Sequence, residues 1–330
     1  MRRALPVVFA ATLSAVVTAG GAEPDRRIVA AAAVALREAP GVSRGVVARL
    51  PLGTLVVEIA RTGGVDTIGG ETAPWLEVAT PSGEQGWLFG ALTLPYTEAE
   101  RDALVLEIAK DRLRRTGDPF EAFAELHAFL VWAAGEAATP EARARIELAT
   151  LRALDRASGA IGFRRRREEK VLAWVEKHTR DLVWNEPAAR WIVVADRFWE
   201  LHGRSASLPA ADEIAWEAAR AQLPGECEGD VPCRLSWLAR TDGRYLDQRP
   251  RGAHAGEALA NVAAALEEAV GDPRGAALFT GSPREDLERM RSDLETLKAL
   301  LVRVDDPRAG VARSAADELL ARVAAAGGKR

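Results

Sequence analysis

The spacing of hydrophobic residues changes character near residue 97. Before that point, short apolar runs such as Leu55–Ile59 and Trp75–Val78 are separated by turns rich in glycine and proline, a pattern typical of short β-strands. After it, apolar residues recur every three or four positions, which predicts amphipathic helices. We therefore expect an α+β protein, with a small β-domain over residues 28–96 followed by an all-α domain over residues 97–330.

The helical part carries helix-start signals at fairly even intervals. Proline follows a polar residue where a helix is expected to begin, as in Thr139-Pro140 and Asp306-Pro307. Signals of this kind place helix starts near residues 119, 140, 163, 187, 209, 232, 283 and 307. Two helices per unit give a period of about 45 residues, within the range of HEAT-like helical hairpins. A solenoid of hairpins and an irregular helical bundle both remain open.

The last two helices are expected to pack as an antiparallel hairpin. One segment carries apolar residues three and four positions apart, and the next carries apolar residues four positions apart, so each has one apolar face. The two stripes are Leu287, Met290, Leu294, Leu297, Leu301 and Val304, followed by Val311, Ala315, Leu319 and Val323.

The first residues have the three-part layout of a secretory signal. A basic start, Met1-Arg2-Arg3, precedes an apolar stretch from Ala4 to Val17, and small residues end at Ala22. A retained membrane anchor is the alternative, but a spanning helix needs about 20 apolar residues and this run is shorter. We expect cleavage near Ala22, a periplasmic or secreted location, and no stable membrane span in the mature protein.

The two cysteines, Cys227 and Cys233, lie close together in the chain. In an oxidising compartment such a pair is expected to form a local disulfide, and two buried thiols are the alternative. Closing so short a loop stabilises the folded chain by about 2 kcal/mol on the chain-entropy model. A metal site needs more ligands than the surrounding sequence offers.

Composition and motifs argue against several classes of function. The 330 residues carry a net charge of −4 and a pI near 5.8, so no general attraction to nucleic acid is expected. Zinc-protease and phosphate-loop motifs are missing from the sequence, and the Gly-x-Ser-x-Gly match at Gly41–Gly45 falls in a loop. We expect no catalytic residue, no metal, no cofactor and no nucleic-acid partner.

The N-terminal part resembles a bacterial SH3-type (SH3b) domain. The resemblance rests on Leu36–Pro40, Leu50–Thr54, Trp75–Val78 and Gly86–Leu88, in that order and spacing. It implies a small β-barrel that binds peptides or peptidoglycan cross-bridges. The chain departs from the family in its reduced opening motif and in a long insertion over Arg61–Pro74, which is expected to reshape the groove.

Two tryptophans of this part are candidate ligand-binding residues. Trp75 and Trp87 fall where the SH3b family places its own tryptophans. The alternative for Trp75 is a core residue, and a buried indole then needs a partner for its N–H group. The sequence does not identify that partner.

A second candidate surface lies in the helical part. Trp184 sits at an expected turn, and the run Arg164–Arg167, which includes Arg165, precedes it in the chain. The first explanation of the run is a solvated helix face with pairs such as Arg165–Glu169, and a binding surface is the alternative. As a functional surface, aromatic and arginine side chains together suit an anionic glycan or lipid headgroup.

One stretch of the helical part resembles the repeat boundary of periplasmic tetratricopeptide-type proteins. Tyr245-Leu246 would end one helix, Pro250 and Gly252 would form the turn, and His254-Ala255 would open the next helix. The resemblance implies a helical repeat scaffold with a protein partner. Together, these features predict an exported, non-enzymatic binding or scaffold protein of the bacterial cell envelope, whose partner is cell-wall peptide or an envelope protein. The alternative is an envelope enzyme, of the peptidoglycan hydrolase kind, with an unrecognised site in its helices.

Overall fold

The computed structural model describes residues 25–228, 230–279 and 282–327, so the signal expected at residues 1–22 lies outside the described residues. The chain divides into two compact units, Met1–Ala138 and Thr139–Arg330, called here the sheet unit and the helical unit. Strands and helices are both present, which confirms the α+β class. The last strand of the sheet unit ends at Pro95, but this unit also includes the first two helices.

The sheet unit is built on seven antiparallel strands in the order β3-β2-β8-β7-β4-β1-β9. Strands β5 and β6 form a separate hairpin within the predicted insertion. Among the described residues the edge strands β3 and β9 do not pair with each other, so the sheet is open and no closed barrel is found. The strands are β1 Arg26–Val29, β2 Val34–Arg37, β3 Val46–Leu50, β4 Leu55–Arg61, β5 Asp66–Ile68, β6 Glu71–Ala73, β7 Trp75–Ala79, β8 Gln85–Phe89 and β9 Thr93–Pro95.

One face of this sheet forms a dry core because side chains alternate along each strand. Strand β7 directs Leu76 and Val78 into the core, and Leu88 of β8 joins them, all at most 2% exposed. Glu77 and Trp87, which pair across the same two strands, therefore lie on the opposite face.

Helices α1 (Arg101–Arg114) and α2 (Phe120–Gly135) complete the sheet unit. The Glu125 carboxylate of α2 accepts hydrogen bonds from the backbone N–H groups of Leu52, at 2.6 Å, and Ala33, at 3.3 Å. Gly53 follows with a φ of +84°, and a Cβ atom there would overlap the ring of Phe129. Helix α2 therefore packs against the turn between β3 and β4, and only glycine fits at position 53 of this turn.

The helical unit contains helices of very unequal length and one β-hairpin. Its α-helices run from 5 to 21 residues, and a π-helical segment, Ala239–Gly243, joins α7 to α8. The elements are α3 Pro140–Gly159, α4 Glu169–Lys177, β10 Leu182–Asn185, β11 Arg190–Val193, α5 Ala195–Arg204, α6 Ala211–Arg220, α7 Val231–Leu238, α8 Arg244–Gln248, α9 Ala255–Gly271, the 3-10 helix Gly275–Phe279, α10 Arg284–Leu301 and α11 Pro307–Gly327.

Two of the expected helix starts are wrong. Residues 162–168 form turns, and helix α4 begins only at Glu169. Pro187 lies in the turn of the β10–β11 hairpin instead of opening a helix. The β-branched residues Ile192 and Val193, beside Trp191, are the signal for a strand that helical spacing obscured.

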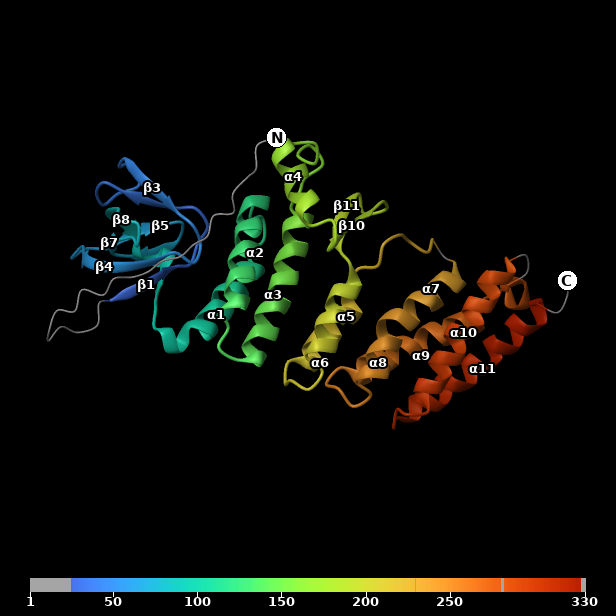
Figure 1. Cartoon of the computed structure of the whole chain (residues 1–330). Helices are drawn as coiled ribbons and strands as arrows, with labels where there is room; N and C mark the ends of the chain where they lie inside the picture. The colour runs from blue at the N-terminus through green and yellow to red at the C-terminus, as the bar shows by residue number, and fades with distance from the viewer. Residues whose placement is uncertain (1–24, 229, 280–281, 328–330) are drawn as a thin grey trace, which may run out of the picture. The chain divides into compact units, whose positions relative to one another are not determined.

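Helices α10 and α11 pack against each other, with α9 beside α11 (Figure 1). Leu294, Leu297 and Leu319 are completely buried in the shared core. Val311, expected in the stripe of α11, is 54% exposed, because Ala309 and Ala312 take the buried positions on either side of it. In the part of the chain that the structure describes, no helix is both long and apolar enough to cross a membrane.

The turn between α8 and α9 is held by a buried tyrosine. The hydroxyl of Tyr245 donates to Asp212 at 2.7 Å and accepts from the backbone N–H of His254 at 3.1 Å. Burial and this carboxylate raise the pKa of Tyr245 above its usual range. Gly252 lies so close to both groups that any side chain there would overlap them. The aromatic residue and the glycine of this segment therefore have a structural role.

Candidate functional site

Trp75 lies in the interior of the sheet unit. Its side chain is only 3% exposed, and its ring packs at 5.8 Å, centroid to centroid, from that of Phe89. The indole N–H donates to the Asp66 carboxylate at 2.6 Å. Asp66 belongs to the hairpin inside the insertion, so this insertion supplies the partner that the sequence did not reveal. The geometry favours the core role for Trp75 over direct ligand contact.

Trp87 is half-buried on the outer face of the sheet. Its neighbours across the adjacent strands are Glu77 on β7 and Arg37 on β2. The indole of Trp87 is therefore partly open to solvent between one acidic and one basic residue.

The helical unit gathers aromatic rings and an arginine on one surface. Trp184 of β10 pairs directly with Trp191 of β11, and their rings meet edge to face with centroids 4.9 Å apart. The guanidinium of Arg166 lies 3.8 Å from the ring centroid of Phe163 and 5.6 Å from that of Trp184. Phe163, Arg166, Trp184 and Trp191 are called here the aromatic–arginine surface.

The turn 162–168 holds this surface in place. The backbone N–H of Arg165 donates to the carbonyl of Gly162 at 2.9 Å, and the Arg165 side chain binds the Glu168 carboxylate with two contacts, at 3.0 and 3.2 Å. Arg165 lies in this turn and Glu169 opens helix α4, so the two residues do not share the helix on which the expected pair depends. Across the described residues Arg166 and Arg167 form no ion pair, so their charges face solvent.

The hairpin under the surface is anchored by polar contacts. Asn185, 1% exposed, accepts a hydrogen bond from the backbone N–H of Gly225 at 3.3 Å. Arg190, at the start of β11, binds the side-chain oxygen of Gln222 at 2.9 Å and lies 3.8 Å from the Asp155 carboxylate. A rigid base of this kind holds the Trp184–Trp191 pair in one orientation.

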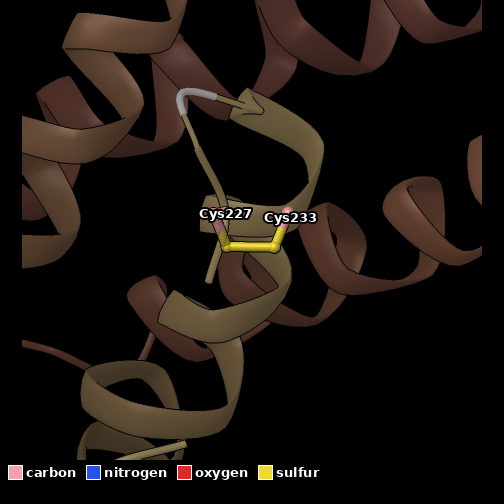
Figure 2. Close-up of a disulfide and its surroundings, with 2 residues drawn as sticks. All are labelled: Cys227 and Cys233. Carbon is pink, nitrogen blue, oxygen red and sulfur yellow. A yellow bond between two sulfur atoms is a disulfide. The ribbon is translucent and has the colours of Figure 1, made fainter. Parts of the chain in front are cut away.

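The two cysteines form a disulfide, as expected. Cys227 and Cys233 are bridged with their Cα atoms 5.5 Å apart, and Figure 2 shows the bridge linking the incoming loop to the start of a helix. That helix is α7, which begins at Val231. The bridge therefore fixes the first turn of α7.

A cavity of about 690 Å³ lies beside this bridge, between α7 and α10. Its lining includes Trp237 from α7, Arg240 from the π-helical segment that follows and Asp293 from α10. Burial raises the pKa of Asp293, opposed by a hydrogen bond from Ser236 and by the charges of Arg289 and Arg240. The sequence analysis missed this site, because the two helices that form it are separated by about fifty residues of chain.

The remaining polar residues show no catalytic grouping. No set of three or more histidine, cysteine or acidic side chains gathers in metal-binding geometry within the described ranges. The acidic side chains Glu213 and Glu217 are ion-paired with Arg152, at 3.1 and 2.7 Å. The loop Gly41–Gly45 joins strands β2 and β3 and so is not a strand-to-helix elbow.

Comparison with known proteins adds no relative. The chain matches no family model, no curated protein and no solved structure. The functional argument therefore rests on the residues and their geometry. Of the four candidate binding residues, Trp184 lies in the aromatic–arginine surface and Arg165 supports it, whereas Trp75 and Trp87 lie on one face of the adjacent strands β7 and β8 in the sheet unit, with Trp75 buried and Trp87 half-buried.

Proposed function

We propose that this protein is an exported, non-enzymatic binding protein of the bacterial cell envelope, and that its aromatic–arginine surface holds an acidic cell-wall glycan. The observation that carries the proposal is the stack of Arg166 on Phe163, whose side chain is 73% exposed. Keeping a phenyl ring in water forfeits the free energy of its burial, about 1.5–3 kcal/mol for a side chain of this size. A ligand that covers the ring recovers part of that free energy.

The chemistry of the surface suits a sugar chain with carboxylate groups. Flat aromatic faces pack against the C–H faces of sugar rings, and a guanidinium binds a carboxylate through two parallel hydrogen bonds. Glu186 accepts a hydrogen bond from the indole N–H of Trp184 and offers further lone pairs to sugar hydroxyls. Peptidoglycan, with sugar rings and peptide carboxylates, combines both features.

The same surface is less suited to a lipid bilayer. An interfacial membrane site buries a continuous apolar face, but here the exposed ring of Phe163 is covered on one side by the guanidinium of Arg166 and is followed in the chain by four arginines. The glycan is therefore the better fit.

Co-sedimentation of the purified full chain with peptidoglycan sacculi tests this proposal. We expect saturable binding that falls about tenfold in Phe163→Ala and in Arg166→Gln, because losing about 1.4 kcal/mol of contact free energy is a tenfold change in affinity. Trp132→Ala is the matched control, because Trp132 is 50% exposed but belongs to α2 of the sheet unit. Its affinity should equal that of the unmodified chain.

Three outcomes would overturn the proposal. If both variants bind sacculi as tightly as the unmodified chain, the aromatic–arginine surface does not contact peptidoglycan. Binding to phosphatidylglycerol vesicles without binding to sacculi assigns the surface to a membrane instead. Clearing of a peptidoglycan gel by the pure protein shows an envelope enzyme.

A further inference from the structure

The cavity between α7 and α10 is built from one stripe of each helix. Positions three and four residues apart lie on one face of a helix. Helix α7 and the turn after it contribute Ser236, Trp237 and Arg240, and α10 contributes Asp286, Met290 and Asp293. The volume of about 690 Å³ falls within the range of small-molecule sites.

One polar atom of the cavity is buried without a partner, and two further groups beside it are unengaged. The Oδ2 atom of Asp293 is buried and has no hydrogen-bond donor. The indole N–H of half-buried Trp237 has no acceptor within the described part of the chain, and Arg240, which is exposed, forms no ion pair there. A buried group without a partner costs about 1–3 kcal/mol, so a ligand that donates to Asp293 is favoured.

The charges lining the cavity are mixed. Asp286 is engaged by Arg289 at 3.3 Å, so that pair neutralises itself. Asp293, which has a hydrogen bond from Ser236 but no ion pair among the described residues, and Arg240, which forms no ion pair there either, remain as one acid and one base. A ligand with a single charge would satisfy only one of them.

We propose that this cavity binds a zwitterionic ligand of the amino-acid or short-peptide class. The ammonium group of the ligand donates to Asp293, its carboxylate binds Arg240, and its apolar body packs on Trp237 and Met290. This site is separate from the aromatic–arginine surface and does not depend on the function proposed for it.

The disulfide forms part of the wall of this cavity. Cys233 lines it, and the bridge to Cys227 ties the first turn of α7 to the preceding loop (Figure 2). Removing the bridge frees that turn. Affinity for the ligand is therefore expected to depend on the oxidised state of the pair.

Isothermal titration calorimetry with three related probes tests the proposal on the full chain. The probes are alanyl-alanine, its N-acetyl form without the ammonium charge, and its C-terminal amide without the carboxylate. We expect alanyl-alanine to bind at least tenfold more tightly than either derivative. Absence of saturable binding by all three probes, or equal binding of all three, would overturn the assignment.

Variants then assign the two ends of the ligand. Asp293→Asn, which is nearly isosteric, should abolish the preference for the free amine, and Arg240→Gln should abolish the preference for the free carboxylate. Asp305→Asn is the control, because Asp305 is exposed and has no ion-pair partner among the described residues. Circular dichroism confirms that each variant is folded. Retention of both preferences in a folded Asp293→Asn, Arg240→Gln double variant would refute the proposed contacts.

A disulfide variant tests the contribution of the bridge. The Cys227→Ser, Cys233→Ser double variant should bind alanyl-alanine several-fold more weakly than the oxidised chain. Equal affinity would overturn the contribution assigned to the bridge.

Discussion

Replacing Asp66 with alanine should destabilise the sheet unit through a residue in a different strand. The Asp66 carboxylate accepts the indole N–H of Trp75 at 2.6 Å, and Trp75 is 3% exposed. A hydrogen bond to a charged group contributes about 1.5–3 kcal/mol to stability. Because Asp66 itself is exposed, water partly replaces it, so we expect a loss of about 1.5 kcal/mol.

A double-mutant cycle isolates this hydrogen bond from other effects. Asp66→Ala, Trp75→Phe and the double variant are unfolded in urea and compared with the unmodified chain. Labelling with 5-fluorotryptophan gives each tryptophan a fluorine signal, and the signal missing from Trp75→Phe identifies Trp75. Unfolding of Asp66→Ala is followed by the fluorine signal of Trp75. In the Trp75→Phe single variant and in the double variant, unfolding is followed by the fluorine signal of Trp87 in the same sheet.

The expected coupling free energy between the two side chains is about 1 kcal/mol. Glu71→Ala is the matched control, because Glu71 is an exposed acid on the other strand of the same hairpin and has no ion-pair partner in the described structure. That variant should unfold like the unmodified chain. A coupling below about 0.3 kcal/mol, the usual error of additivity, would refute the idea that the insertion stabilises the sheet through this contact.

Two further changes test the packing of each unit. Gly53→Ala should lower the free energy of unfolding by about 2 kcal/mol or more, because it combines a φ of +84° with overlap of the Phe129 ring. Gly83→Ala, at a φ of +94° in open space, should lower it by only about 1 kcal/mol. Equal losses of the two variants in urea unfolding would contradict this difference. In the helical unit, burial and then the charge of Arg249 lower the pKa of His202 below 6.5, and the Arg249 Nε–H donates to His202 Nε2 at 3.2 Å. The unfolded chain then binds more protons than the folded chain, so the stability of this unit falls as pH drops below 6.5 until the folded pKa is passed. Between pH 7 and 5 the thermal unfolding temperature should therefore fall less in His202→Gln than in the unmodified chain. Identical falls in the two chains would contradict the role of His202.

Local signals in the sequence predicted a good part of the fold. Pro140 and Pro307 begin α3 and α11 as expected, because proline at the first helical position acts on its immediate neighbours. The disulfide between Cys227 and Cys233 follows from their spacing. The change from strands to helices near residue 97 follows from the period of the apolar residues.

Local signals failed where two of them conflicted. A helix was expected near residue 163, but α3 is followed by the turn 162–168, which Gly162 and the Arg165–Glu168 pair stabilise. Pro187 likewise fits a hairpin turn as well as a helix start, and the paired tryptophans beside it decide in favour of the hairpin.

The sequence by itself determined the change from strands to helices near residue 97, the start of several helices, the disulfide and the presence of an aromatic and arginine-rich segment, since each depends on residues close together in the chain. Only the tertiary structure decided that the sheet stays open and that the Asp66 carboxylate accepts the indole N–H of Trp75. It also decided that Arg166 stacks on Phe163 and that a cavity lies between α7 and α10. The physical reason is that these features depend on packing directions and register, which side chains distant in sequence set only when the chain is folded.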